Sequence, residues 1–104
     1  MNAQILYVTV DSELNSERIA REVLESKLAA CVNIIRNVQS LYIENGNIKS
    51  SVEYILIIKT VVEKKDQIVK KLIELHPYNT PCILSTNSMS CNKKFYDWLM
   101  LQCS

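Results

Sequence analysis

Few residues of this chain could carry out catalysis or bind a metal. They are a single histidine and four widely spaced cysteines: His76, Cys31, Cys82, Cys91 and Cys103. His76 with Cys31 or Cys82 could form a thiol–imidazole pair, which is one way to activate a cysteine nucleophile. Such a pair also needs a third group that orients the imidazole and donors that stabilise an oxyanion, and the sequence indicates neither. We therefore predict that the protein is not an enzyme.

The spacing of the cysteines points away from a structural metal site. The chain has no C-x-x-C pair and only one histidine, which excludes a zinc knuckle and a multi-histidine site within one chain. Free cysteine is among the most buried residue types, so we favour Cys31 as a small buried apolar side chain over a metal ligand or redox thiol. A domain with an adequate core does not need disulfides, and we predict four reduced thiols in a cytoplasmic protein.

Composition excludes several kinds of partner. Twelve lysines and arginines against eleven acidic residues leave a net charge of +1, which gives no reason to expect nucleic acid or an anionic membrane. Gly46 is the only glycine, so a glycine-rich phosphate loop is excluded. No window approaches the roughly 20 apolar residues that span a bilayer, and no signal peptide is evident. At 104 residues, we predict a single domain over residues 1–104.

The segment around which the chain is organised is a long predicted hairpin, residues 32–43 and 48–60, joined at Asn45-Gly46. Asn-Gly between apolar, β-branched runs is a strong hairpin signal, because a type I′ turn needs positive φ at both central residues. The second strand is apolar on both faces between Tyr54 and Ile58, whereas a strand with one solvated face alternates. A two-residue turn predicts these partners across the hairpin: Tyr42 with Lys49, Val38 with Glu53, Ile34 with Ile57 and Val32 with Lys59.

Two charged residues interrupt the apolar hairpin. Glu53 and Lys59 lie roughly 20 Å apart along a strand, so they cannot pair with each other within one chain. Each must bind a partner elsewhere or reach water, and we favour solvated strand ends.

The remaining segments complete a strand–helix–strand–strand–helix–strand order. We expect a strand over residues 4–10, a helix over 13–27 capped by Asp11-Ser12, a helix from Glu63 that Pro77 ends, a strand over 82–86 and a last helix over 93–103 capped by Asn92. This order is the α+β, ferredoxin-like arrangement, an antiparallel sheet with two helices on one face. The bare face and the hairpin edges would promote aggregation, so we expect further copies of the chain to cover them in a closed, symmetric assembly.

Several motifs together resemble the CutA family of divalent-cation tolerance proteins. They are Lys27-Leu-Ala-Ala-Cys-Val-Asn-Ile34, Ser40-x-Tyr42, Asn45-Gly46, Glu53, Leu56-x-Ile-Lys-Thr60, Leu75-His-Pro-Tyr78, Thr80-Pro81 and Trp98-Leu99. They span nearly the whole chain in the order in which the family has them. The resemblance implies the ferredoxin-like fold and a tight homotrimer in which long hairpins cross between subunits. It also implies a role in metal tolerance with copper binding, without an established enzymatic activity.

The resemblance further implies a metal site that this sequence retains only in part. Bacterial members linked to metal binding have a cysteine in the first strand, the histidine of the His-Pro-Tyr motif and a glutamate after the following proline. The matching residues here are Val8, His76 and Cys82. Val8 cannot be a ligand, whereas one imidazole and one thiolate could suit copper(I) or zinc if neighbouring subunits supplied further ligands. The alternative that we favour for His76 is a helix-terminal ring bonded to backbone.

Two hypotheses of function remain. The first is a trimeric, non-enzymatic, cytoplasmic protein of the divalent-metal response, which needs no cofactor and binds copper or another divalent cation weakly near His76 and Cys82. The second is a PII-like trimeric signalling or scaffolding module that binds a small ligand or a partner protein at clefts between subunits. The lack of a phosphate-binding motif argues against a nucleotide. The residues predicted at such a cleft are Cys31, Tyr42, Glu53, Lys59, Tyr78 and Trp98.

Overall fold

A computed structural model describes residues 1–104 and shows the predicted order of elements with one added strand. The elements are β1 (Asn2–Val10), α1 (Glu13–Glu25), β2 (Cys31–Glu44), β3 (Asn47–Val61), a 3-10 turn (Val62–Lys64), α2 (Lys65–Leu75), β4 (Ile83–Ser85), β5 (Met89–Ser90) and α3 (Lys93–Gln102). The short β5 was not predicted. No helix is both long and apolar enough to cross a membrane.

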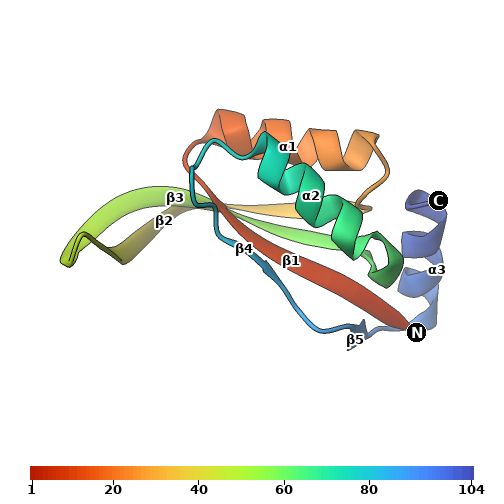
Figure 1. The fold of residues 1–104 in the computed structure, drawn as a ribbon. Helices are drawn as coiled ribbons and strands as arrows, with labels where there is room; N and C mark the ends of the chain where they lie inside the picture. The colour runs from red at the N-terminus through yellow and green to blue at the C-terminus, as the bar shows by residue number, and fades with distance from the viewer.

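The strands form one antiparallel sheet in the order β2-β3-β1-β4, and β5 pairs with the start of β1. With α1 and α2 side by side over one face, this is the predicted ferredoxin-like α+β fold (Figure 1). α3 lies at the end of the sheet beside the N-terminus, and the tip of the β2–β3 hairpin extends far beyond the helices. We call this projecting part, residues 38–53, the arm. It makes the molecule elongated, with extents of 45 × 24 × 23 Å.

The main core lies between the sheet and the two helices. Alternate residues of β1 point toward the helices, which buries them, as the strand period of two requires. The apolar stripes of α1 and α2 close this layer from above. Its ten buried members are Leu6, Val8, Val10, Ile19, Val23, Ala29, Leu56, Ile58, Ile68 and Leu72. A second cluster, Ala3, Val61, Leu99 and Cys103, fixes α3 to the sheet.

The hairpin turn has the geometry that the sequence predicts. Asn45 and Gly46 have φ angles of 51° and 77°, both positive, as a type I′ turn requires. Next to the turn the predicted partners are confirmed, with Tyr42 opposite Lys49 and Val38 opposite Glu53. The turn therefore sets the register of the whole arm.

Beyond the arm the predicted register is wrong. A bulge between Ile35 and Val38 shifts the pairing by one residue, so that Ile34 lies opposite Leu56 and Val32 opposite Ile58. Asn37, inside the bulge, has a φ of 56°, a left-handed conformation that asparagine adopts more readily than most residues. Bulges bend and twist a strand, and this one stands where the arm leaves the body.

The bulge also brings the edge strand into contact with α1. Arg36 forms an ion pair with Glu13, and its second guanidinium nitrogen lies 3.7 Å from Glu17. The Arg36 side chain is 48% exposed, so these pairs add little to stability.

Local signals set most helix ends as predicted. Ser12 caps α1, its Oγ accepting a hydrogen bond from the Asn15 amide at 3.1 Å. α2 ends at Leu75, and the backbone before Pro77 is extended. α1 ends at Glu25, two residues earlier than predicted. Asn92 occupies the predicted N-cap position of α3, although its side chain makes no capping hydrogen bond.

The sheet face opposite the helices carries apolar side chains without a covering layer. Tyr7 lies opposite Ile57 on one side and Leu84 on the other, and paired residues share a face. Leu84 is 59% exposed and Ile35 is 47% exposed. Along the arm, Leu41, Ile43, Ile48 and Val52 are between 60% and 75% exposed. The bare apolar surface that the sequence predicts is therefore present.

Candidate functional site

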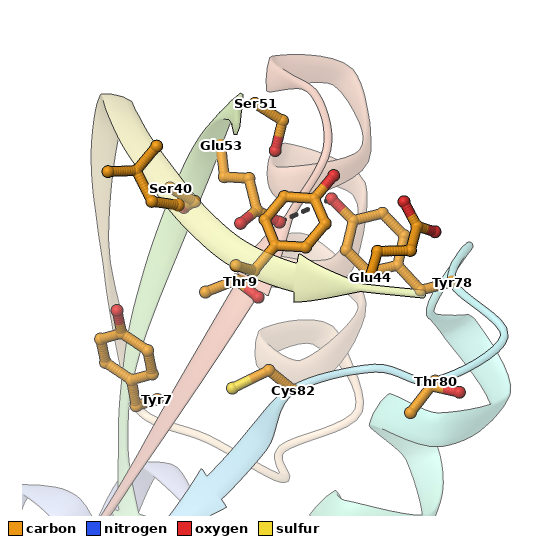
Figure 2. A pocket seen from close by; sticks show the side chains of 11 residues that line it. Tyr7, Thr9, Ser40, Glu44, Ser51, Glu53, Tyr78, Thr80 and Cys82 are labelled. Atoms are coloured by element: carbon orange, nitrogen blue, oxygen red, sulfur yellow. Dashed lines mark hydrogen bonds between the residues drawn. The ribbon is translucent and has the colours of Figure 1, made fainter. Parts of the chain in front are cut away.

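A hollow of about 640 Å³ lies between the arm, β1 and the loop after α2 (Figure 2). This volume falls within the range of small-molecule sites, about 300–1,000 Å³. The lining residues are Ser40, Leu41, Tyr42, Glu44, Ser51 and Glu53 of the arm and its tip, Tyr7 and Thr9 of β1, and Tyr78, Thr80 and Cys82 of the loop. We refer to this space as the hollow.

Strand alternation and register determine which side chains reach the hollow. Tyr7 and Thr9 alternate with buried core residues of β1, so they point to the face opposite the helices. On the arm, Ser40 lies opposite Ser51, and Glu53 follows two residues later on the same face. The floor of the hollow is therefore the bare face of β1, and one wall is formed mainly by one face of the arm, with Leu41 added from the other face.

The best-defined contact in the hollow joins Tyr78 to Glu53. The Tyr78 hydroxyl donates a hydrogen bond to Glu53 Oε2 at 2.7 Å. Burial raises the pKa of Tyr78 well above its ordinary value, and the hydrogen bond and negative charge of Glu53 raise it further. Asp11 and Tyr42 act in the same direction. The phenol therefore stays protonated as the donor, and Glu53, predicted as a solvated strand end, has an internal partner instead.

His76 is a buried structural residue, only 8% exposed. Its Nδ1 accepts a hydrogen bond from the Tyr78 amide at 3.1 Å, so the ring proton lies on Nε2, which donates to the Thr9 carbonyl at 2.7 Å. The imidazole also packs on the Tyr78 ring, with the centroids 4.7 Å apart. This is the backbone-bonded ring that we favoured from the sequence.

These contacts test the metal site that the resemblance implies. A metal at His76 would have to displace one of its two backbone partners. No group of three or more histidine, cysteine, aspartate or glutamate side chains is placed to hold an ion. The residues of a single chain therefore do not fit that metal site, and a site completed by neighbouring subunits stays a prediction.

The residues that the sequence predicts at a cleft lie in two separate places in the structure. Tyr42, Glu53 and Tyr78 line the hollow together, and Cys82, predicted as a metal ligand, lines it with them. The other three predicted residues, Cys31, Lys59 and Trp98, do not line it.

The second place is the other end of β3, beside α3. Cys31 lies opposite Lys59 there, and Cys31 is half-buried instead of fully buried. Lys59 Nζ stands 6.0 Å from the centroid of the Phe95 ring, a cation–π distance. Trp98 stacks on the same ring with a centroid distance of 5.7 Å. Lys59 therefore has an aromatic partner within the chain.

The sequence reasoning missed most of the hydroxyl groups in the hollow. The missed lining residues are Tyr7, Thr9, Ser40, Leu41, Glu44, Ser51 and Thr80. The alternation within residues 4–10 would have placed Tyr7 and Thr9 on the bare face. The serines of the arm carry no comparable signal. All four cysteines are free in the structure.

Fold and site together define an α+β, ferredoxin-like protein with a long projecting arm and a polar, aromatic hollow at its base. The family model described as "CutA1 divalent ion tolerance protein" matches residues 4–102, and the chain belongs to this family. It is 38% identical to the divalent-cation tolerance protein CutA of Archaeoglobus fulgidus over 94 residues, 90% of this chain and 91% of that protein. The predicted family resemblance is therefore confirmed.

Solved structures agree over nearly the full length. The crystal structure of the divalent ion tolerance protein CutA1 from Ehrlichia chaffeensis matches with a TM-score of 0.95 at 32% identity, covering 99% of this chain and 96% of that chain. The structure of CutA from Archaeoglobus fulgidus, described as a periplasmic protein, matches with a TM-score of 0.93 at 35% identity, covering 98% and 99%.

Proposed function

We propose that this chain works as a non-enzymatic, cytoplasmic homotrimer in the response to divalent metal ions. The family description links it to divalent ion tolerance. The observation that carries the proposal of self-association is the bare apolar surface, formed by the uncovered sheet face and the projecting arm. Free thiols are typical of a reducing compartment, which supports the cytoplasmic location.

The exposed side chains of the arm give the scale of the driving force. Leu41, Ile43, Ile48 and Val52 are each at least 60% exposed. Fully burying a side chain of this size contributes about 1.5–3 kcal/mol, so four of them give roughly 6–12 kcal/mol per subunit before entropic costs. A two-stranded hairpin without such cover is marginally stable in water. Association is therefore the favourable state for the arm.

A closed ring suits this surface better than an open array. The edge strand β2 and the bare face can each contact another copy of the chain. If these contacts did not close into a ring, further copies would keep adding and would form fibres. The count of three follows from the resemblance to the CutA family, in which hairpins cross between subunits.

Light scattering on purified arm variants tests self-association. Replacing Ile43 and Ile48, which lie opposite each other near the turn, with serine should lower the mass from that of a trimer toward 12.0 kDa. Leu14→Ser is the matched control, because Leu14 is 78% exposed on α1 and is not part of the arm. An arm variant that keeps the parent mass would refute the proposed role of the arm.

Copper binding in this proposal is weak and depends on Cys82. The thiol is half-buried and lines the hollow, whereas the imidazole of His76 is engaged with backbone. A thiolate suits copper(I), and a site with one thiolate and no free imidazole has few strong ligands. Further ligands would come from neighbouring subunits.

A copper(I) titration against a competing chelator, on protein purified without an affinity tag, tests this assignment. Cys82→Ser should abolish stoichiometric binding. Cys91→Ser is the control, since Cys91 is also a half-buried free thiol but lies beside Met1, outside the hollow. Equal affinities for Cys82→Ser and the parent would remove Cys82 from the proposal.

The hollow supports a second candidate function, a PII-like module that binds a small ligand or a partner. Its volume and mixed lining are those of a small-molecule site. A thermal-shift screen of metabolites on the intact assembly tests this candidate, and a screen without any stabilising compound would argue against it.

A further inference from the structure

The bare sheet face carries two charged residues at opposite ends of an apolar stretch of β3. Lys59 pairs with Ile5 of β1, two residues before Tyr7, so its side chain points to the face opposite the helices. Glu53 is six positions away on the same strand and therefore points to the same face, with Ile55 and Ile57 between them. Six positions span roughly 20 Å, so the two charges cannot meet within one chain.

Lys59 has no carboxylate partner in its own chain. No ion pair of the structure includes it, although the side chain is half-buried between Ile5 of β1 and Cys31 of β2. Its ammonium group has only the ring of Phe95, at 6.0 Å from the centroid. A ring face attracts an ammonium group weakly, so covering this end of the sheet would leave a cation with little compensation.

Glu53 has the complementary property. It is half-buried, and its Oε2 accepts the Tyr78 hydroxyl, which fixes the carboxylate and leaves Oε1 without a partner in the chain (Figure 2). One lysine, Lys49, lies on the same face of the arm, opposite Tyr42. It is exposed, four positions or roughly 13 Å from Glu53 along the strand, and forms no ion pair. Lys49 therefore leaves Glu53 available to another cation.

Covering the bare face with another copy removes water from both ends of this stretch. A buried charge without a counter-charge is costly, so a tight interface here needs a partner for each of the two groups. Every copy supplies one cation and one carboxylate, and a contact that pairs them repeats from copy to copy around a closed ring. Complementary charges also fix the register in which two apolar surfaces meet.

We propose that the Lys59 ammonium of one copy forms an ion pair with the Glu53 carboxylate of the next. This inference rests on the proposed self-association and adds to it the contact that aligns two copies. The cleft residues predicted from the sequence are then two halves of one interface. The half around Glu53 and Tyr78 comes from one copy, and the half around Lys59 and Trp98 comes from its neighbour.

A double-mutant cycle on subunit exchange tests this pair. Isotope-labelled and unlabelled assemblies are mixed, and native mass spectrometry follows the exchange, which reports dissociation even when dilution does not separate the copies. Lys59→Met and Glu53→Gln keep the approximate size of each side chain. Each should speed exchange about tenfold or more, because it leaves the opposite charge buried without a partner. The double variant should exchange no faster than the faster single variant, since neither charge is then left alone.

Lys49→Met is the matched control, because it removes the same charge from an exposed position on the same face of the arm. Its effect should multiply with that of Glu53→Gln, as expected for independent sites. Within one chain Glu53 and Lys59 are too far apart to couple, so coupling in the exchange rate would locate the contact between copies.

Two results would overturn the pair while leaving self-association intact. They are effects of Lys59→Met and Glu53→Gln that simply multiply, and coupling of Glu53 to Lys49 in place of Lys59. Sedimentation of the parent distinguishes the other failure, because a species of 12.0 kDa would refute self-association and the pair together.

Discussion

Replacing His76 with alanine removes an imidazole that joins two segments far apart in the chain. The ring accepts a hydrogen bond from the Tyr78 amide and donates one to the Thr9 carbonyl, at 3.1 and 2.7 Å. Because the site is only 8% exposed, both backbone groups would lose a partner in a place that water reaches poorly.

The expected cost follows from these two contacts. Leaving a buried donor or acceptor unsatisfied costs about 1–3 kcal/mol, so two such groups cost roughly 2–6 kcal/mol. Native domains are stable by only about 5–15 kcal/mol, so His76→Ala should lower the urea midpoint strongly without changing the slope. Glu74→Ala, at an exposed position in the last turn of α2, is the control and should have little effect.

Fluorescence of Trp98 during urea unfolding measures this change. Protein concentration must be held constant, because association shifts the apparent stability by mass action. A copper titration on the folded variant should give the affinity of the parent. An unchanged midpoint together with a large loss of copper affinity would refute the structural role of His76 and restore it as a ligand.

Three further substitutions test individual contacts. The pKa of Tyr78 is raised from 10.0 in the folded chain, so above about pH 10 the unfolded chain loses this proton while the folded chain keeps it. The stabilisation from the protonated Tyr78 is therefore fully present below about pH 10 and falls as the pH rises. Tyr78→Phe should flatten the fall of the urea midpoint between about pH 9 and about pH 11. Gly46→Ala should cost about 1 kcal/mol in urea unfolding, because an added Cβ meets no atom within 4 Å and only the positive φ of 77° is strained. Thr60→Val should cost about 1–2 kcal/mol in the same assay, since it removes a 2.7 Å hydrogen bond to the Leu28 carbonyl.

The parts of the fold that depend on local chemistry could be predicted from the sequence. Asn45-Gly46 predicts a turn with two positive φ angles, and Pro77 predicts the end of α2. Each of these signals acts within a few residues. The order of the elements followed from such signals together with the periodicity of the apolar residues.

The bulge could not be predicted in the same way. Asn37 tolerates positive φ, but an asparagine in a strand is a weak signal on its own. The shift depends on how β2 packs against β3 and α1, where Arg36 meets Glu13. One residue of slip therefore changed every predicted partner on the body side of the arm. β5 is only two residues long, too short for a periodic pattern.

The candidate site was predicted only in part for the same reason. Tyr42, Glu53 and Tyr78 are polar-tipped residues near predicted apolar strands, and all three line the hollow. The same rule also selected Lys59 and Trp98, which lie at the other end of the sheet. Nothing in a single sequence gives the path of the loop after α2, and that path decides which residues converge.

Sedimentation equilibrium of the untagged chain over a range of micromolar concentrations tests the central claim most directly. The bare sheet face and the exposed arm predict a species of about three times 12.0 kDa, with little dissociation on dilution. A soluble species of 12.0 kDa over the whole range would show that the apolar surface needs no cover, and would contradict the proposed assembly.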